Sequence, residues 1–168
     1  VLKVAFVHHH LEPGGVTRVM ETAWSALASL EQDLQGMVLS GLPYKGSELP
    51  EVKVVESIGY ATRSSRTDPR TIVDLLEKDA TEAFGSLPDV WHLHNHSLGK
   101  NPALSEAVHI LAEKGHAMLL HIHDFAEDGR PSNYSALRSD MTQFERLYPV
   151  GSKIRYAALN QRDASFLL

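Results

Sequence analysis

The stretch Leu119–Asp124, Leu-Leu-His-Ile-His-Asp, organises this chain of 168 residues. Its apolar beginning suits a buried strand, and its end places two histidines and an aspartate before a polar segment. We therefore expect a strand at Ala117–Ile122 whose carboxyl end opens into a site. Two other apolar runs lead into similar residues, at His8–His10 and at His92–His96. Whether these three ends meet decides what chemistry they can support.

Several other short apolar runs have the length and the β-branched residues of strands, and they alternate with segments of helical periodicity. The expected strands are Lys3–Val7, Gly36–Leu39, Val52–Val55, Asp89–Leu93, Ala117–Ile122 and Lys153–Leu159. This alternation predicts an α/β fold, a Rossmann-like three-layer sandwich with a mostly parallel sheet of about six or seven strands. The length predicts one domain, spanning residues 1–168.

Local signals mark where the longer helices begin. Gly14 and Gly15 form a tight turn before a helical stripe that starts at Val16. Asp68-Pro69 and Asn101-Pro102 each combine a helix N-cap with a proline in the first helical position, and each predicts a helix that follows.

The last third of the chain has weaker signals. Phe125–Ser139 shows no periodicity and predicts a long loop, which suggests function. A short helix is expected near Asp140–Tyr148. Asn160, with Asp163 three residues later, predicts the start of another helix, inside which we expect the chain to stop.

The composition excludes several classes of protein. The net charge of −5 and the pI of about 6.0 give no basis for binding nucleic acid. Cysteine is absent, so disulfides, thiolate nucleophiles and Cys-ligated zinc are excluded, and we expect a cytoplasmic location. No segment approaches the roughly 18 apolar residues of a membrane span. The start, Val1–Val7, predicts a first strand and not a signal peptide.

Ligands of parallel sheets bind outside the carboxyl ends of the strands, at the switch point of the strand order. That rule gathers Gly14–Gly15, His92–His96 and His123–Asp124 at one edge. The glycine turn at a helix N-terminus suits a phosphate, although a tight turn without a ligand is about equally expected. His123 could exchange a proton or hydrogen-bond a sugar hydroxyl, and Asp124 could orient it or cap the loop.

The remaining histidines leave an alternative open. His92, His94 and His96 alternate, so on a continuing strand they would share one face. With His121 and His123 they could form a metal site, and a metal-dependent hydrolase is the rival function. For these histidines we favour polar structural roles or contacts with a substrate. We interpret His121 as a core residue whose hydrogen bonds are satisfied.

Other conspicuous side chains have simple structural interpretations. His109 and His116 are expected to be exposed, whereas Trp24 and Trp91 are expected in or near the core. Three arginines could hold an anionic acceptor, but a solvated basic surface is favoured for them. These arginines are Arg63, Arg66 and Arg70. A flavodoxin-like receiver domain is disfavoured because Glu12 is the only acid close to the end of the first strand.

Four segments together resemble the N-terminal domain of GT-B glycosyltransferases, in the retaining group often called family 4. Their order and spacing carry the resemblance, which spans nearly the whole chain. The segments are KVAFVHHHLEPGGVTRV (3–19), PDVWHLHNH (88–96), LLHIHDF (119–125) and YAALNQRDASFL (156–167).

The resemblance implies the acceptor-side domain of a two-domain enzyme, the N-terminal half of a GT-B fold. Such an enzyme transfers a sugar from a nucleotide diphosphate sugar to an acceptor, with retention and without a metal or other cofactor. A C-terminal nucleotide-sugar-binding domain is then missing, so we expect a truncated chain that is inactive alone. The resemblance allows peripheral membrane association of the full-length enzyme. Acceptor, donor and oligomeric state stay open.

The resemblance also assigns roles to residues. His123 and Asp124 would be catalytic, with His123 contacting the transferred sugar. The remaining residues would bind the donor phosphates or the acceptor, and no residue would bind a metal. They are Gly14, Gly15, Val16, Arg18, His94, Asn95 and His96.

Overall fold

A computed structural model describes residues 1–61 and 67–167 of the chain. In these residues six strands form one parallel sheet in the order β3-β2-β1-β4-β5-β6. The strands are β1 (Leu2–His8), β2 (Leu34–Ser40), β3 (Glu51–Val54), β4 (Val90–His94), β5 (Met118–Ile122) and β6 (Ile154–Ala158). Each of the six predicted strands is present, within a few residues of its predicted bounds.

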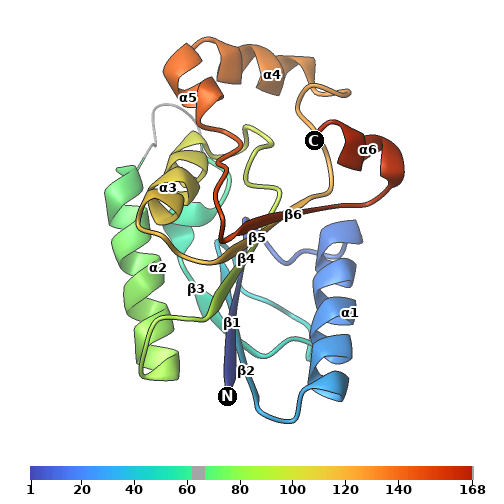
Figure 1. Ribbon diagram of the computed structural model, residues 1–168, viewed down its shortest axis with the longest axis vertical. Coiled ribbons are helices and arrows are strands. Elements are labelled where there is room, and N and C mark those ends of the chain that lie inside the picture. The colour runs from blue at the N-terminus through green and yellow to red at the C-terminus, as the bar shows by residue number, and fades with distance from the viewer. Residues whose placement is uncertain (62–66, 168) are drawn as a thin grey trace.

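Helices cover both faces of the sheet, which confirms the predicted Rossmann-like sandwich of three layers (Figure 1). On one side lie α2 (Pro69–Phe84) and α3 (Pro102–Glu113), and on the other lies α1 (Gly15–Leu30). The shorter elements are η1 (Glu56–Ile58), α4 (Pro131–Arg138), α5 (Met141–Glu145) and α6 (Gln161–Ser165). Figure 1 shows α4 and α5 beyond the carboxyl ends of the strands, at the top of the view.

The predicted caps are present at the helix ends. The Asp68 carboxylate accepts a hydrogen bond from Arg70 N at 2.7 Å, and Asn101 Oδ1 accepts one from Leu104 N at 3.1 Å. Helix α2 ends at Phe84 and is followed by the C-cap Gly85, whose φ of 71° lies in the left-handed region that glycine tolerates. Helix α1, in contrast, has no side-chain cap at its N-terminus.

The predicted loop Phe125–Ser139 is wrong, because α4 lies within it. Pro131 begins this helix, and Leu137 is buried on its inner side. Leu137 packs with Ala126 and Leu147 in a small apolar cluster of their own, apart from the main core. One buried residue in a helix of eight gives too little periodicity to detect, so the packing of α4 determines its structure more than its sequence pattern does.

Two further predictions about the last third have clear outcomes. The short helix expected near 140–148 is confirmed as α5. Asn160 caps α6 as predicted, with Asn160 Oδ1 accepting from Asp163 N at 2.9 Å. Helix α6 ends at Ser165, however, so the expectation that the chain stops inside this helix was wrong.

The predicted burial of the two tryptophans is confirmed, whereas the predicted exposure of two histidines is wrong. Trp91 is completely buried and Trp24 packs against the smaller core beneath α1. His116 is not exposed, because its Nε2 lies 2.8 Å from a carboxylate oxygen of Glu77 and its side chain is only 11% exposed. His109 is also partly buried.

Of the three arginines considered as an acceptor site, only Arg70 lies in the described part of the chain. Arg70 lies exposed in the first turn of α2. Arg63 and Arg66 fall outside the described residues. Among the described residues, no helix is both long enough and apolar enough to cross a membrane.

Candidate functional site

The carboxyl ends of β1, β4 and β5 meet, as the sequence predicted. His8 Nδ1 lies 3.1 Å from the carbonyl oxygen of His94, and the His94 and His123 rings are in contact. The strand order reverses between β1 and β4, and a pocket of about 140 Å³ opens beside this switch point. Its lining is His8, His9, His10, Glu12, Pro13, Gly14, Gly15, Val16, Thr17, Tyr60, Asn95, Leu98, Asp124 and Arg130. We call it the switch-point pocket.

The glycine turn forms one wall of the switch-point pocket. Gly14 is extended, with φ of 176°, and no side chain caps the helix that follows. A Cβ added to Gly15 would meet nothing within 4 Å, so the turn stands open on that side. The first N–H groups of a helix have no partner within the helix and sit at its positive end. Gly15 and Val16 therefore present an environment that suits an anion.

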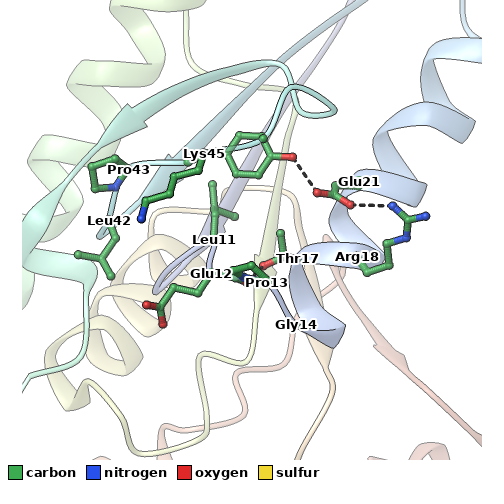
Figure 2. A pocket seen from close by; sticks show the side chains of 12 residues that line it. Leu11, Glu12, Pro13, Gly14, Thr17, Arg18, Glu21, Leu42, Pro43 and Lys45 are labelled. Carbon is green, nitrogen blue, oxygen red and sulfur yellow. Dashed lines mark hydrogen bonds and ion pairs between the residues drawn. The ribbon is translucent and has the colours of Figure 1, made fainter.

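Arg18 does not join this wall, although it was predicted with it. Its Nη1 lies 3.1 Å from Glu21 Oε2, and its side chain is 78% exposed. It lines a second, larger pocket of about 640 Å³ between the start of α1 and the segment after β2, which we call the α1 pocket (Figure 2). Tyr44 also lines the α1 pocket, and its hydroxyl donates to Glu21 Oε1 at 2.7 Å.

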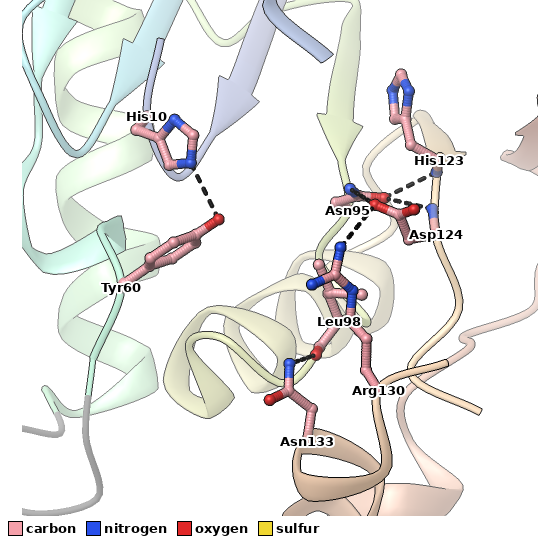
Figure 3. A network of polar contacts seen from close by, with 8 residues as sticks. All are labelled: His10, Tyr60, Asn95, Leu98, His123, Asp124, Arg130 and Asn133. Atoms are coloured by element: carbon pink, nitrogen blue, oxygen red, sulfur yellow. Dashed lines mark hydrogen bonds and ion pairs between the residues drawn. The ribbon is translucent and has the colours of Figure 1, made fainter. Parts of the chain in front are cut away.

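Asn95 connects the ends of β4 and β5. Its φ of 54° is the only positive value among the non-glycine residues described, and asparagine tolerates this left-handed conformation better than most residues. The turn brings Asn95 Oδ1 to the backbone of the next strand, where it accepts from His123 N at 2.8 Å and from Asp124 N at 3.2 Å (Figure 3). Asn95 therefore fixes the backbone of both predicted catalytic residues.

The same turn overturns the expectation that three alternating histidines share a face. Strand β4 ends at His94, and the left-handed Asn95 sends the chain in a new direction. His92 and His94 remain stacked, with ring centroids 4.3 Å apart. His96 is buried elsewhere, and its Nε2 lies 2.8 Å from the carbonyl oxygen of Leu147.

His123 is a nearly buried, neutral imidazole. Its Nε2 lies 2.9 Å from His94 Nδ1, and the residue is 8% exposed. Burial, together with His121 nearby, lowers the pKa of His123 to about 4, against the opposing effect of the Asp124 charge. At neutral pH the ring is therefore uncharged and can donate or accept one hydrogen bond at its remaining nitrogen.

Asp124 does not orient the His123 ring, which was one of its two predicted roles. Its Oδ2 lies 3.4 Å from Arg130 Nη2 and 3.4 Å from Asn95 Nδ2. Asp124 is exposed at the mouth of the switch-point pocket and anchors the residue that precedes α4. The other predicted role, fixing the loop that follows β5, agrees with these contacts.

His121 was expected to be a satisfied core residue, but it is only about half-buried. Its Nδ1 lies 3.3 Å from His92 Nε2, and the two rings stack with an interplanar angle of 3°. The metal-binding alternative rested on His92, His94, His121 and His123, and the structure places all four rings in one group.

Tyr60 and Arg130 line the switch-point pocket but were not singled out from the sequence. The Tyr60 hydroxyl lies 3.0 Å from His10 Nε2, and the ammonium of Lys100 lies 5.1 Å from the centre of the Tyr60 ring. Arg130 belongs to the segment that was predicted as a loop (Figure 3). Pro131 was the available signal for it, because a proline in the first helical position would have placed Arg130 at a helix start.

A parallel sheet with a pocket at its switch point and an open glycine turn defines a Rossmann-like ligand-binding domain. No protein-family model matches the chain. The chain is 31% identical over 173 aligned positions to mannosylglucosyl-3-phosphoglycerate synthase of Petrotoga mobilis, an alignment that covers 96% of this chain and 33% of that enzyme. The chain thus spans about a third of the length of this relative. The relative is a glycosyltransferase, which supports that broad class for the chain and does not favour the hydrolase alternative.

Proposed function

We propose that this chain is the acceptor-side domain of a retaining glycosyltransferase with a GT-B fold, which uses a nucleotide diphosphate sugar. The observation that carries the proposal is the switch-point pocket, which the open glycine turn, Asn95 and Asp124 line together. His123 adjoins this pocket through its backbone N–H, which Asn95 holds. The similarity to a glycosyltransferase over 96% of the chain supports the class.

The donor diphosphate would lie against the glycine turn. Gly15 and Val16 offer helix N–H groups and the positive end of the α1 dipole there. Arg130 adds a guanidinium to the same pocket, partly neutralised by Asp124 at 3.4 Å. The N–H groups of His123 and Asp124 already donate to Asn95, so they are committed to holding the site together and not to the phosphates.

His123 would contact the transferred sugar. Its ring is held by His94 on one side, and it is neutral at the pH of most cells because burial lowers its pKa to about 4. A neutral imidazole can hydrogen-bond a sugar hydroxyl without the repulsion that an imidazolium would exert on the positive charge developing at the anomeric carbon. Catalysis in this proposal is positional and electrostatic, and no step passes through a metal.

The acceptor would enter from the α1 pocket, which adjoins the glycine turn at Glu12–Gly14. The name of the Petrotoga mobilis relative contains a phosphoglycerate unit, and by analogy we propose a small anionic acceptor for this chain. Arg18 and Lys45 are the cations that line the α1 pocket, together with the acids Glu12 and Glu21. Because Glu21 already pairs with Arg18, Lys45 is the cation offered to an anionic acceptor. A cytoplasmic location, a requirement for a second domain and peripheral membrane association of the whole enzyme remain parts of the same proposal.

The test is turnover of the full-length enzyme that carries this domain. His123→Ala should lower kcat by about two orders of magnitude, the range of a lost acid–base or electrostatic contact. His109→Ala is the matched control, because His109 lies on α3 against the opposite side of the sheet and should leave kcat unchanged. Unchanged kcat for His123→Ala would remove His123 from the site.

A further inference from the structure

Four histidines form a cluster on the α1 side of β4 and β5. His94 and His121 are register partners on neighbouring strands, and His92 and His123 lie two residues before and after them on the same side. The rings of His92 and His94 are 4.3 Å apart, as are those of His121 and His123. Phe6, the register partner of His92 on β1, packs against its ring at 5.0 Å. We call this set the histidine cluster.

Three members converge closely enough to share an ion. His92, His94 and His121 each offer one ring nitrogen, and these three atoms lie within 4.8 Å of one another. Nitrogens bound to tetrahedral zinc at about 2.0–2.1 Å stand roughly 3.4 Å apart. A contraction of the widest separation by about 1.4 Å would bring the three nitrogens to the spacing of zinc ligands.

The nitrogen atoms of the histidine cluster have little else to bind. His92 Nε2 contacts His121 Nδ1 at 3.3 Å, and His94 Nδ1 contacts His123 Nε2 at 2.9 Å, so the contacts run within the cluster. Among the described residues, His94 Nε2 is buried without any hydrogen-bond partner. When His94 donates from Nδ1 to His123, this orphaned Nε2 carries the lone pair that a metal needs.

We propose that His92, His94 and His121 bind one divalent transition-metal ion of the zinc type. Imidazole ligands favour Zn²⁺, Cu²⁺, Ni²⁺ and Co²⁺ over Mg²⁺ and Ca²⁺, which prefer oxygen. Three imidazoles leave the fourth position of a tetrahedral ion to water. The three proposed ligands lie on the sheet face and do not line the switch-point pocket, so metal binding can be tested without a transferase assay.

The experiment measures metal binding to the protein directly. After dialysis against a chelator, Zn²⁺ is titrated calorimetrically and Co²⁺ is titrated by visible spectroscopy, with Mg²⁺ as the comparison ion. We expect one Zn²⁺ or Co²⁺ per chain, a tetrahedral Co²⁺ spectrum that Zn²⁺ abolishes by displacement, and no Mg²⁺ binding. His92→Ala and His121→Ala should each weaken Zn²⁺ binding by more than about tenfold.

His109→Ala and His116→Ala are the matched controls, because these histidines lie outside the cluster and pair with Glu113 and Glu77. Both variants should bind Zn²⁺ as the unaltered protein does. Circular dichroism identifies any variant that fails to fold, and the Co²⁺ spectrum of the unaltered protein tests the proposal without any variant. Absence of stoichiometric binding, or binding that survives in folded His92→Ala and His121→Ala proteins, would overturn it.

Discussion

The two faces of the β4–β5 strand pair are made from the same strands and differ completely in chemistry. One face carries Trp91, Leu93, Met118 and Leu120, each no more than 2% exposed, in the core that α2 and α3 cover. The other carries the histidine cluster on the side of α1. Alternation along Trp-His-Leu-His in β4 sends each residue to the opposite side from its neighbour.

The difference separates the two tasks of the strand pair. The apolar face removes large side chains from water and provides stability. The histidine face packs rings that exchange few hydrogen bonds and are held neutral by burial. It therefore contributes less to stability, but it offers ring nitrogens that can bind a proton or a ligand. We therefore expect substitutions on the first face to act on folding and those on the second to act mainly on pH dependence and ligand binding.

The largest expected effect tests the apolar face. Trp91→Ala removes a completely buried indole that packs in the main core, and it should lower the free energy of unfolding by about 3–5 kcal/mol. His92→Ala, one residue along the same strand, should cost much less at neutral pH. Urea denaturation of both variants checks the contrast. Equal losses would mean that the two faces contribute alike.

The next-largest effect concerns Asn95, the residue that follows β4 and ends the histidine face. Asn95→Ala leaves the buried N–H of His123 without its acceptor, at a cost of about 1–3 kcal/mol, and forces alanine into a left-handed conformation. Asn95→Gly loses the same acceptor but tolerates the conformation. We expect the glycine variant to be the more stable of the two by about 1 kcal/mol in chemical denaturation. The reverse order would show that the backbone at 95 is not constrained.

The smallest effect is the pH dependence of stability that the histidine face should produce. His92 has a folded pKa of about 3, below the value of 6.5 for an unperturbed histidine. Above about pH 6.5 the ring is neutral in both states. As the pH falls below that value, only the unfolded chain binds the proton, so stability is lost. From pH 6.5 to 5 this one residue should account for about 2 kcal/mol of the loss.

His92→Gln should remove that part of the pH dependence. The variant and the unaltered protein are compared by urea denaturation at pH 6.5 and at pH 5. We expect the decline in the free energy of unfolding to be smaller in the variant by about 2 kcal/mol. Identical declines would contradict the assignment of a depressed pKa to His92.

The sequence alone predicted the strands, the longer helices and the fold class, because the signals for these features are local. Strand composition and paired cap-and-proline signals, such as Asp68-Pro69 and Asn101-Pro102, depend on residues close together in the chain. The meeting of the three strand ends followed from the general rule for parallel sheets. These features needed no knowledge of side-chain direction.

The remaining features depend on directions and packing that local signals do not encode. The left-handed turn at Asn95 separates His96 from His92 and His94, and no residue pattern announces it. Arg18 follows the glycine turn in sequence, but it pairs with Glu21 and faces the α1 pocket. Arg130 reaches the switch-point pocket only because α4 packs on its own small core.

The strand order has a consequence for how the chain acquires its structure. Strand β1 lies in the middle of the sheet, between β2 and β4, and Val4 pairs with Val90 across 86 positions of sequence. During synthesis the first strand can pair with β2 early, but its other edge stays open until β4 emerges. Pairings between such distant residues slow folding, because the loop must close before the contact forms. The glycine turn and His8 therefore reach their final neighbours only after β4 has joined the sheet.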